Sequence, residues 1–321
     1  MPGQTKRFNF VANNLIVYLS KFKIMNTTNN TLQNEIDNIV NNRYLSNRQK
    51  HEALIKCGLR PADIRMLSFS KRMSRLHPVY RIGDLTFGVE IECINAPSYD
   101  LCREVQSRGI NIAYEGYNHN DYHDRFKLVT DASLHGSNPI ECVSPILKGV
   151  KGESDLRLVC EALNAIGASV NRSCGLHVHF DASKMSDEHY IRIFKNYQKL
   201  EALIDKFMPV SRRGSNATYC DSIVRFNYGG CNRKSDVCSV MGGRYYKVNP
   251  RAYSSHKTIE FRHHSGTVNY TKIIMWVNFL RDLIKFSHES EITATPTSLD
   301  ELDWVSPAVK EYYKARIESL A

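Results

Sequence analysis

The chain contains several short runs in which apolar residues alternate with polar ones or in which β-branched and aromatic residues are concentrated. These runs predict β-strands at residues 85–93, 126–130, 139–145, 174–181, 223–228 and 257–263. Elsewhere, apolar residues recur every three or four positions, which predicts helices at residues 156–166, 193–207 and 273–284. Since strands and helices do not alternate strictly, an α+β domain with a mainly antiparallel sheet fits better than a Rossmann fold or an eight-fold barrel.

The pattern weakens towards the N-terminus and divides the chain into three expected regions. Residues 1–34 are rich in Asn and Thr and show little periodicity, so we expect a flexible segment. Residues 35–78 are basic and predict a small helical region. The main domain is expected to occupy residues 79–321 and to end in helices.

The basic prefix accounts for almost all of the excess positive charge. Residues 1–80 hold 13 of the 43 lysines and arginines but only 4 of the 33 acidic residues, which gives +9 of the total charge of +10. Ser46 or Asn47 can cap a helix that ends at Gly58, and Pro61 can open another. These helices could form a DNA-binding bundle, or a prefix that packs on the main domain, which we favour. An acidic or nucleic-acid partner is therefore predicted for this region alone.

Four of the predicted strands share an unusual polar side. Because side chains alternate across a strand, each turns apolar residues to one face and ionisable residues to the other. The ionisable residues are Glu90 and Glu92, Glu141, His177 and His179, and Glu260 and Arg262. Strict alternation would add His264 to the same face. The wet face of an ordinary sheet is rich in Thr, Lys, Gln and Ser instead, so these strands predict a face that collects carboxylates.

Carboxylates that lie side by side repel one another, and a bound cation offsets this repulsion. Glutamate oxygens are hard ligands that suit Mg²⁺ or Mn²⁺, whereas a zinc site more commonly has three nitrogen or sulfur ligands. The chain has no Cys-x-x-Cys pair to support zinc. The excess of carboxylate beside arginine further suggests that the metal ions hold phosphate groups.

Composition and cysteine usage restrict where the protein is expected to work. The hydrophobic content of 42% and the charged content of 24% are ordinary for a globular protein. No window of about 18 consecutive apolar residues predicts a membrane span. The nine cysteines are scattered, and Cys93, Cys142 and Cys160 lie in apolar runs as small buried residues would. We therefore expect a cytoplasmic protein without a membrane partner.

Six segments, taken in order, resemble the amidoligase family, which is related to glutamine synthetase and glutamate–cysteine ligase. They are Phe-Gly-Val-Glu-Ile-Glu at 87–92, Glu-Gly-Tyr-Asn-His at 115–119, Phe-Lys-Leu-Val-Thr-Asp-Ala-Ser-Leu at 126–134, Ile-Glu-Cys-Val-Ser-Pro-Ile-Leu at 140–147, Gly-Leu-His-Val-His at 175–179 and Thr-Ile-Glu-Phe-Arg-His-His-Ser-Gly-Thr at 258–267. The resemblance covers roughly residues 84–287. It departs from the family at 131–133, where Asp-Ala-Ser replaces the frequent Asp-Gly-Ser.

The resemblance implies a glutamine-synthetase-like fold, in which a curved, mainly antiparallel sheet carries helices on its convex side. It implies that ATP and its metal ions bind the concave face. The implied activity is that of an ATP-dependent carboxylate–amine ligase, which forms an amide bond through an acyl phosphate with Mg²⁺, or alternatively Mn²⁺. The substrates would be a carboxylate and an amine from amino acids, peptides or protein side chains, and residues 79–321 would be the catalytic domain.

The resemblance also implies roles for individual residues. The implied metal ligands are Glu90, Glu92, Glu141, His177 and Glu260. The implied catalytic residues are Arg262, which would clamp a phosphate or a substrate carboxylate, and Asp131 and Ser133, which would line the acid or amine site. His179 lies beside the implied ligands as a cofactor contact. Further candidates for binding phosphate, outside the six matching segments, are Arg225, Arg244 and Lys247.

Two other classes of function remain open from the residues alone. A His-x-His strand also occurs in metal-dependent hydrolases, where it lies on an early strand of a barrel. In this chain His-x-His lies mid-chain, after the Glu-x-Glu strand. The second alternative is a nucleic-acid-binding protein that acts through the basic prefix, although the prefix has no recognisable zinc pattern or aromatic platform.

Overall fold

The computed structural model describes residues 38–39, 46–57, 85–117 and 124–320. The chain divides into two units, Met1–Val79 and Tyr80–Ala321. In the first unit, helix α3 (Asn47–Lys56) begins with a capping box, in which the Ser46 hydroxyl accepts from the Gln49 amide and the Gln49 side chain accepts from the Ser46 amide. This confirms the predicted helix start. The predictions for residues 1–34 and for a helix after Pro61 lie outside the described residues.

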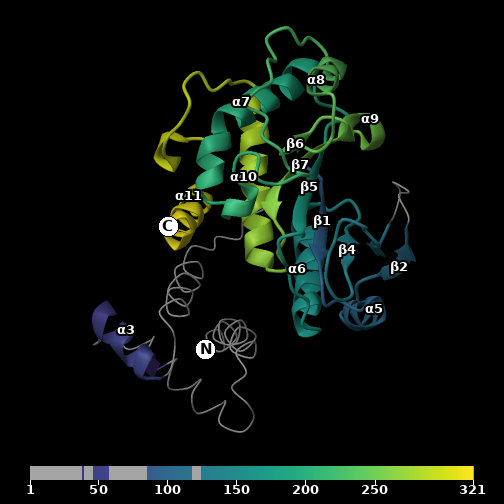
Figure 1. Ribbon diagram of the computed structural model, residues 1–321, viewed down its shortest axis with the longest axis vertical. Helices are drawn as coiled ribbons and strands as arrows, with labels where there is room; N and C mark the ends of the chain where they lie inside the picture. The colour runs from purple at the N-terminus through teal and green to yellow at the C-terminus, as the bar shows by residue number, and fades with distance from the viewer. Residues whose placement is uncertain (1–37, 40–45, 58–84, 118–123, 321) are drawn as a thin grey trace, which may run out of the picture. The chain divides into compact units, whose positions relative to one another are not determined.

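The second unit is built on one sheet of seven strands (Figure 1). The strands are β1 (Phe87–Cys93), β2 (Ile112–Gly116), β3 (Phe126–Val129), β4 (Ile140–Val143), β5 (Gly175–Asp181), β6 (Val248–Asn249) and β7 (Thr258–Ser265). Their order across the sheet is β2-β3-β4-β1-β5-β7-β6. Only β2 and β3 pair in parallel, and the other described pairs are antiparallel. The prediction of a mainly antiparallel sheet is confirmed.

Helices pack mainly on one side of this sheet, where α6, α7 and α10 stand together in Figure 1. The helices of this unit are α5 (Ser98–Ser107), α6 (Gly149–Ala165), α7 (Asp187–Lys206), α8 (Lys234–Met241), α9 (Ala252–His256), α10 (Tyr270–Ser287) and α11 (Pro307–Leu320). Short 3₁₀ helices add η1 (Val210–Arg212) and η2 (Leu299–Glu301). The predicted apolar stripes thus become α6, α7 and α10.

The apolar face of the central strands supplies the core against the helices. Val89, Val178 and Phe261 are buried on β1, β5 and β7, and the ring of Phe261 lies 5.6 Å from that of Tyr197 on α7. Burying such side chains stabilises the fold by about 1.5–3 kcal/mol each relative to leaving them in water. The opposite face is therefore free to carry polar groups.

Helix α7 shows why the polar pattern at its ends specifies its length. The Ser186 hydroxyl accepts from the amide of His189 and caps the first turn. Asp187 and Glu188 lie in that turn, where negative charge interacts favourably with the helix dipole, and Lys206 lies in the last turn. The helix spans 20 residues and ends at Lys206, shortly before Pro209.

One predicted strand is wrong. Residues 223–228 form turns and irregular structure rather than a strand. The backbone groups that a neighbouring strand would bind are taken by side chains of α7. Gln198 donates to the carbonyl oxygens of Ile223, Val224 and Phe226, and Glu201 accepts from the amide of Ile223. Hydrogen bonding to α7 thus replaces sheet pairing here.

Some elements gave too weak a pattern to be predicted. Strand β6 has two residues, and β2 pairs with β3 through an irregular register near Gly116. Helix α8 ends at Gly242, whose φ of 70° suits glycine at a helix terminus. The described residues form eight α-helices and seven strands, a mixed architecture in which the glutamine-synthetase-like form stays a prediction.

The structure bears on two expectations from composition. All nine cysteines lie in the described part of the chain and none of them forms a disulfide there, and Cys93, Cys142 and Cys160 are buried as predicted. Among the residues described, none of the helices combines the length and apolarity needed to cross a membrane. The cytoplasmic location stays a prediction.

Candidate functional site

The site is built where four neighbouring strands turn their polar faces to the same side. In the register of the sheet, Glu92 of β1 lies opposite Glu141 of β4, and Glu90 of β1 lies opposite His177 of β5. His179 of β5 lies in turn opposite Glu260 of β7. Residues that face each other across antiparallel strands point to the same side. The structure therefore brings together the carboxylates and imidazoles that the alternation placed on one face, and we call this group the acid face.

Glu90 lies at the centre of the acid face. One of its oxygens is 2.8 Å from Nδ1 of His177, and the other is 3.2 Å from Nε2 of His179. Burial alone would raise the pKa of Glu90, but the two imidazoles hold it well below its usual range. Burial acts to lower the pKa of His179, and the charges of Glu90 and Glu260 raise it. The pair thus favours an ionised Glu90 beside a protonated His179.

Two further carboxylates are buried in the acid face and hydrogen-bonded. Glu92 is 5% exposed, accepts from the amide of Gly175 and lies 3.5 Å from Nε2 of His177. Glu260 accepts from Arg262 at 2.5 Å and from the amide nitrogen of Asn249, also at 2.5 Å. Burial would raise the pKa of Glu260, but Arg262 and His179 lower it. Both side chains are therefore fixed in position before any ligand arrives.

The repulsion between carboxylates is least compensated at Glu141. Burial raises its pKa well above the usual range, and the charges of Glu90 and Glu92 raise it further. Four glutamates share the acid face with Arg262 and a protonated His179, so negative charge is in excess when all four glutamates are ionised. A bound divalent cation would offset that excess and would favour the ionised form of Glu141.

The donor atoms are close enough to hold such a cation. Glu90, His179 and Glu260 offer ligand atoms within 4.8 Å of one another, and Glu90, Glu141 and His177 do the same. Glu90 belongs to both groups, as a carboxylate between two cations would. Each group contains two carboxylates and one imidazole, which suits Mg²⁺ or Mn²⁺ better than a thiolate-seeking metal. The acid face therefore fits the predicted ion, while the roles of its residues as ligands stay predictions.

A cavity of about 390 Å³ opens beside the acid face. Its lining includes the predicted residues Glu92, Asp131, Ser133, His177, Arg244 and Arg262. Asp131 follows β3 and accepts from the amide of Ser133 at 2.7 Å, so the Asp-Ala-Ser turn forms without glycine. The structure thus places the proposed substrate residues and the predicted arginine clamp around one space.

Two other predicted cations lie away from this cavity. Lys247 is fully buried and binds Glu201 at 2.9 Å and Asp205 at 2.8 Å on the helix-covered side of the sheet. Its ammonium is therefore occupied by acids of the core, and the prediction that it binds a cofactor is corrected. Arg225 is about half exposed and pairs with Asp221 at 2.7 Å. It does not line the cavity, so it contributes to the surface of the same region instead.

His264 also departs from its expected place. The pairing of β5 with β7 shifts so that Val178 lies opposite Phe261 but Leu176 lies opposite His264. A bulge of this kind adds one residue and exchanges the faces of those that follow. His264 is consequently buried on the helix side, with its ring 5.8 Å from that of Trp276.

Sequence reasoning missed several residues of the cavity. Arg172 and Arg212 contribute positive charge to its lining, and Tyr219 and Tyr245 contribute aromatic rings whose centroids are 5.2 Å apart. Arg212 lies in a stretch rich in Ser, Gly and Asn that has no periodicity, so no strand or helix pattern could point to it. The one available signal was the pair of arginines just after Pro209.

The raised pKa of Glu141 makes a prediction about stability and pH. In the metal-free protein, Glu141→Gln removes a carboxyl group that resists ionisation in the folded state. The wild type should lose stability relative to this variant as pH rises above the ordinary glutamate pKa of about 4.5, because the unfolded chain releases the proton more readily. At pH 8 the variant should be the more stable protein, by more than at pH 5. Urea unfolding in EDTA at pH 5 and pH 8 measures the difference, and an equal difference at both values contradicts the assignment.

Comparison with known proteins supports the resemblance seen in the motifs. A search of curated proteins found no match to the chain. Residues 83–227 match the model of a family described as "Putative amidoligase enzyme". This segment contains Glu90, Glu92, Asp131, Glu141 and His177, whereas β7, with Glu260 and Arg262, follows it. The match confirms the predicted resemblance to the amidoligase family over residues 83–227.

Proposed function

We propose that the protein is an ATP-dependent carboxylate–amine ligase that forms an amide bond. The observation that carries this proposal is the position of the acid face beside a cavity lined by Asp131, Ser133 and Arg262. Carboxylates can bind divalent cations, and neighbouring arginines can bind the phosphate groups that those cations accompany, so the arrangement suits phosphoryl transfer. The family match supports amide-bond formation as the outcome.

Mg²⁺, or alternatively Mn²⁺, would be held by Glu90, Glu92, Glu141, Glu260 and His177. When bound, the ions would neutralise the charge of the ATP phosphates. Arg262 would bind the phosphoryl group or the substrate carboxylate from the cavity side. Its hydrogen bond to Glu260 at 2.5 Å holds the guanidinium in place, so little reorganisation is required when an anion enters.

In the proposed reaction, a carboxylate oxygen of the acid substrate attacks the γ-phosphorus of ATP and ADP leaves. The product is an acyl phosphate. The nitrogen of the amine substrate then attacks the acyl carbon, and inorganic phosphate leaves with the electrons of the broken C–O bond. The amine must lose a proton before or during this attack, and Asp131 would accept it at the cavity wall.

The structure gives less support to a metal-dependent hydrolase. In such enzymes the His-x-His strand belongs to a barrel of parallel strands. In the described part of this chain, β5 lies between β1 and β7 and pairs with both in the antiparallel sense. The sheet has edges at β2 and β6. The nucleic-acid alternative concerns residues 1–80, most of which lie outside the described residues, and it would not exclude the ligase.

ATP turnover tests the proposed function directly. With Mg²⁺ and a mixed pool of carboxylic acids and amines, the wild type should release ADP and phosphate only when an amine is present. Glu90→Gln should reduce this rate at least about a hundredfold, because it removes a charge shared by both donor groups. Glu188→Gln is the matched control, since that side chain is 80% exposed in the first turn of α7. A folded protein that does not bind ATP contradicts the proposal.

The role of Asp131 makes a separate prediction. Asp131→Asn should lower turnover with ammonium-type amines by about 10²- to 10⁴-fold, the usual contribution of a positioned base. Turnover with hydroxylamine should fall much less, because that amine is already neutral near pH 7. The ratio of the two rates, measured as phosphate release and hydroxamate formation, is the readout. Equal losses with both amines contradict a role as base.

A further inference from the structure

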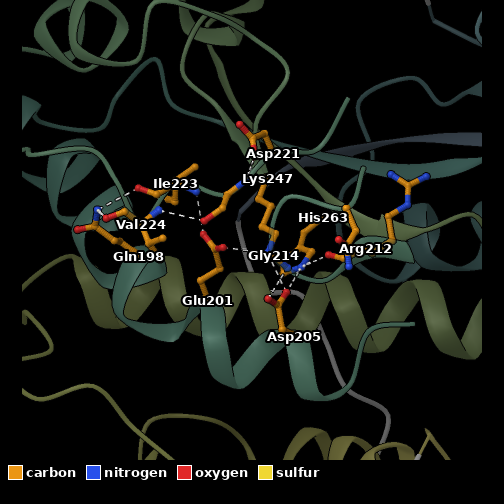
Figure 2. A network of polar contacts seen from close by, with 12 residues as sticks. Gln198, Glu201, Asp205, Arg212, Gly214, Asp221, Ile223, Val224, Lys247 and His263 are labelled. Atoms are coloured by element: carbon orange, nitrogen blue, oxygen red, sulfur yellow. Dashed lines mark hydrogen bonds and ion pairs between the residues drawn. The ribbon is translucent and has the colours of Figure 1, made fainter. Parts of the chain in front are cut away.

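A second cluster of ionisable groups lies buried on the helix side of the sheet, and neither the acid face nor the proposed reaction uses it. Its centre is Lys247, which is fully buried next to β6 and binds Glu201 and Asp205 of α7 (Figure 2). The two acids are one helical turn apart, so both can reach the same ammonium. A buried lysine requires such partners, because an unpaired charge in the core is strongly unfavourable.

Each of the two acids has a second hydrogen bond, and both lead to one segment. Asp205 accepts from the amide of Gly214 at 2.8 Å, and Glu201 accepts from the amide of Ile223 at 2.9 Å. Gly214 and Ile223 are near the two ends of the segment 211–224, which we call the cavity loop. The acids therefore hold the cavity loop at both ends.

Helix α7 adds a third attachment to the end of the cavity loop. The side-chain nitrogen of Gln198 donates to the carbonyl oxygens of Ile223 at 2.9 Å and Val224 at 3.1 Å. The same nitrogen donates to Phe226 just beyond the loop at 2.7 Å. Gln198 and Glu201 share one surface of α7, as Figure 2 shows. The loop is thereby held by side chains of a rigid helix, with one isolated bridge to the segment before β6.

His263 connects the same cluster to Arg212. Its Nε2 lies 2.8 Å from Asp205 and 3.0 Å from the carbonyl oxygen of Arg212. Both partners are acceptors, so Nε2 carries the proton, and Nδ1 accepts from the hydroxyl of Tyr197 at 2.7 Å. Burial lowers the pKa of His263 to about 4, which keeps the ring neutral near pH 7. The ring therefore fixes the main chain of Arg212 in a single position.

The side chain of Arg212 leaves the cluster and reaches the cavity. In Figure 2 its guanidinium points away from Asp205, and one of its nitrogens donates to the carbonyl oxygen of Cys174 at 2.6 Å. The same nitrogen would lie 3.3 Å from a Cβ added to Gly175, and an oxygen of Glu92 would lie 3.2 Å from it, so the two groups flank the same glycine. Arg212 is 7% exposed and lines the cavity. A buried cation is thus placed beside the acid face.

The cavity loop supplies much of the wall around this cation, through Ser211, Arg212, Asn216, Ala217, Thr218 and Tyr219. The loop has no regular secondary structure after η1, so its conformation depends on its attachments. Glu201 and Asp205 both pair with the ammonium of Lys247, and through their other hydrogen bonds they hold the loop. The buried cluster and the cavity wall are therefore connected through the cavity loop.

We propose that Gln198, Glu201, Asp205 and Lys247 are positioning residues, which fix the cavity loop so that Arg212 holds an anionic group of the acid substrate beside the acid face. They touch no ligand and act through the loop. The identification of the anion as the substrate's rests on the proposed function, whereas the anchoring of the loop does not.

The anchoring is tested by the accessibility of Cys220, which lies within the cavity loop and is fully buried. Its rate of alkylation by iodoacetamide, mapped by mass spectrometry, reports local opening of the loop. Glu201→Ala and the milder Gln198→Ala should each increase this rate at least about tenfold, because each removes hydrogen bonds that close the loop. Cys160, buried in α6, is the internal reference and should not change.

Asn196→Ala is the matched control. Asn196 is a buried polar residue of α7, but it binds Ser287 and Ser290 and accepts from the amide of Ile292. Its loss should destabilise the fold while leaving the labelling of Cys220 at the wild-type rate. If Cys220 in folded Gln198→Ala reacts no faster than in the wild type or in Asn196→Ala, the loop is not held by α7 and the proposal is overturned.

The effect on substrate is tested by steady-state kinetics of the ligase reaction. Gln198→Ala and Arg212→Gln should each raise KM for the acid substrate about tenfold or more, with kcat changed much less, because a displaced cation weakens binding of the anion. Asn196→Ala should leave KM unchanged. If kcat falls in proportion to the loss of stability in Gln198→Ala, Arg212→Gln and Asn196→Ala alike, while KM is unchanged, the cluster has only a structural role. Since labelling needs no turnover, a silent ligase assay refutes the proposed function while the Cys220 rates still decide the anchoring.

Discussion

The crowding of four glutamates on one face of an antiparallel sheet is the interaction on which the rest of the structure depends. Two imidazoles and Arg262 relieve part of the repulsion, since Glu90 lies between His177 and His179 and Glu260 binds Arg262. The remainder appears in the raised pKa of Glu141, to which burial and the neighbouring carboxylates contribute. A fold optimised for stability alone would avoid this arrangement, and such departures are characteristic of functional sites.

The two faces of the sheet divide stability from chemistry. The apolar face packs against α6, α7 and α10 and provides the free energy that allows the acid face to exist. The helix layer also contains polar groups with a different task. Lys247 and Glu201 are buried and Asp205 is partly buried beside α7, and the hydrogen bonds of the two acids reach Gly214 and the loop beside the cavity (Figure 2). In this account, α7 supports the core and also shapes the wall of the site.

The sequence predicted the acid face well because strand alternation is a local property. Once β1, β5 and β7 are recognised, period two alone places Glu90, Glu92, His177, His179 and Glu260 on one side. His264 was misplaced because a bulge changes that period, and a bulge depends on how two strands pair.

Other features of the site depend on contacts between distant segments. The backbone of 223–228 reads as a strand, but Gln198 and Glu201 take the hydrogen bonds that a strand would need. In the sequence, Lys247 has no nearby acidic residue to pair with, and its partner Glu201 comes from the distant helix α7. Arg212 has no periodic neighbours at all, and only the folded chain brings it to Glu92. Long-range packing of this kind leaves no signature in a single segment.

The most direct test of the central claim is to measure Mn²⁺ binding to the metal-free protein by electron paramagnetic resonance, with Mg²⁺ as competitor. The account predicts that Mn²⁺ binds, that Mg²⁺ displaces it, and that binding tightens as pH rises because Glu141 must release its proton. A folded protein that binds neither cation would contradict it. So would a Glu90→Gln variant that binds Mn²⁺ as tightly as the wild type.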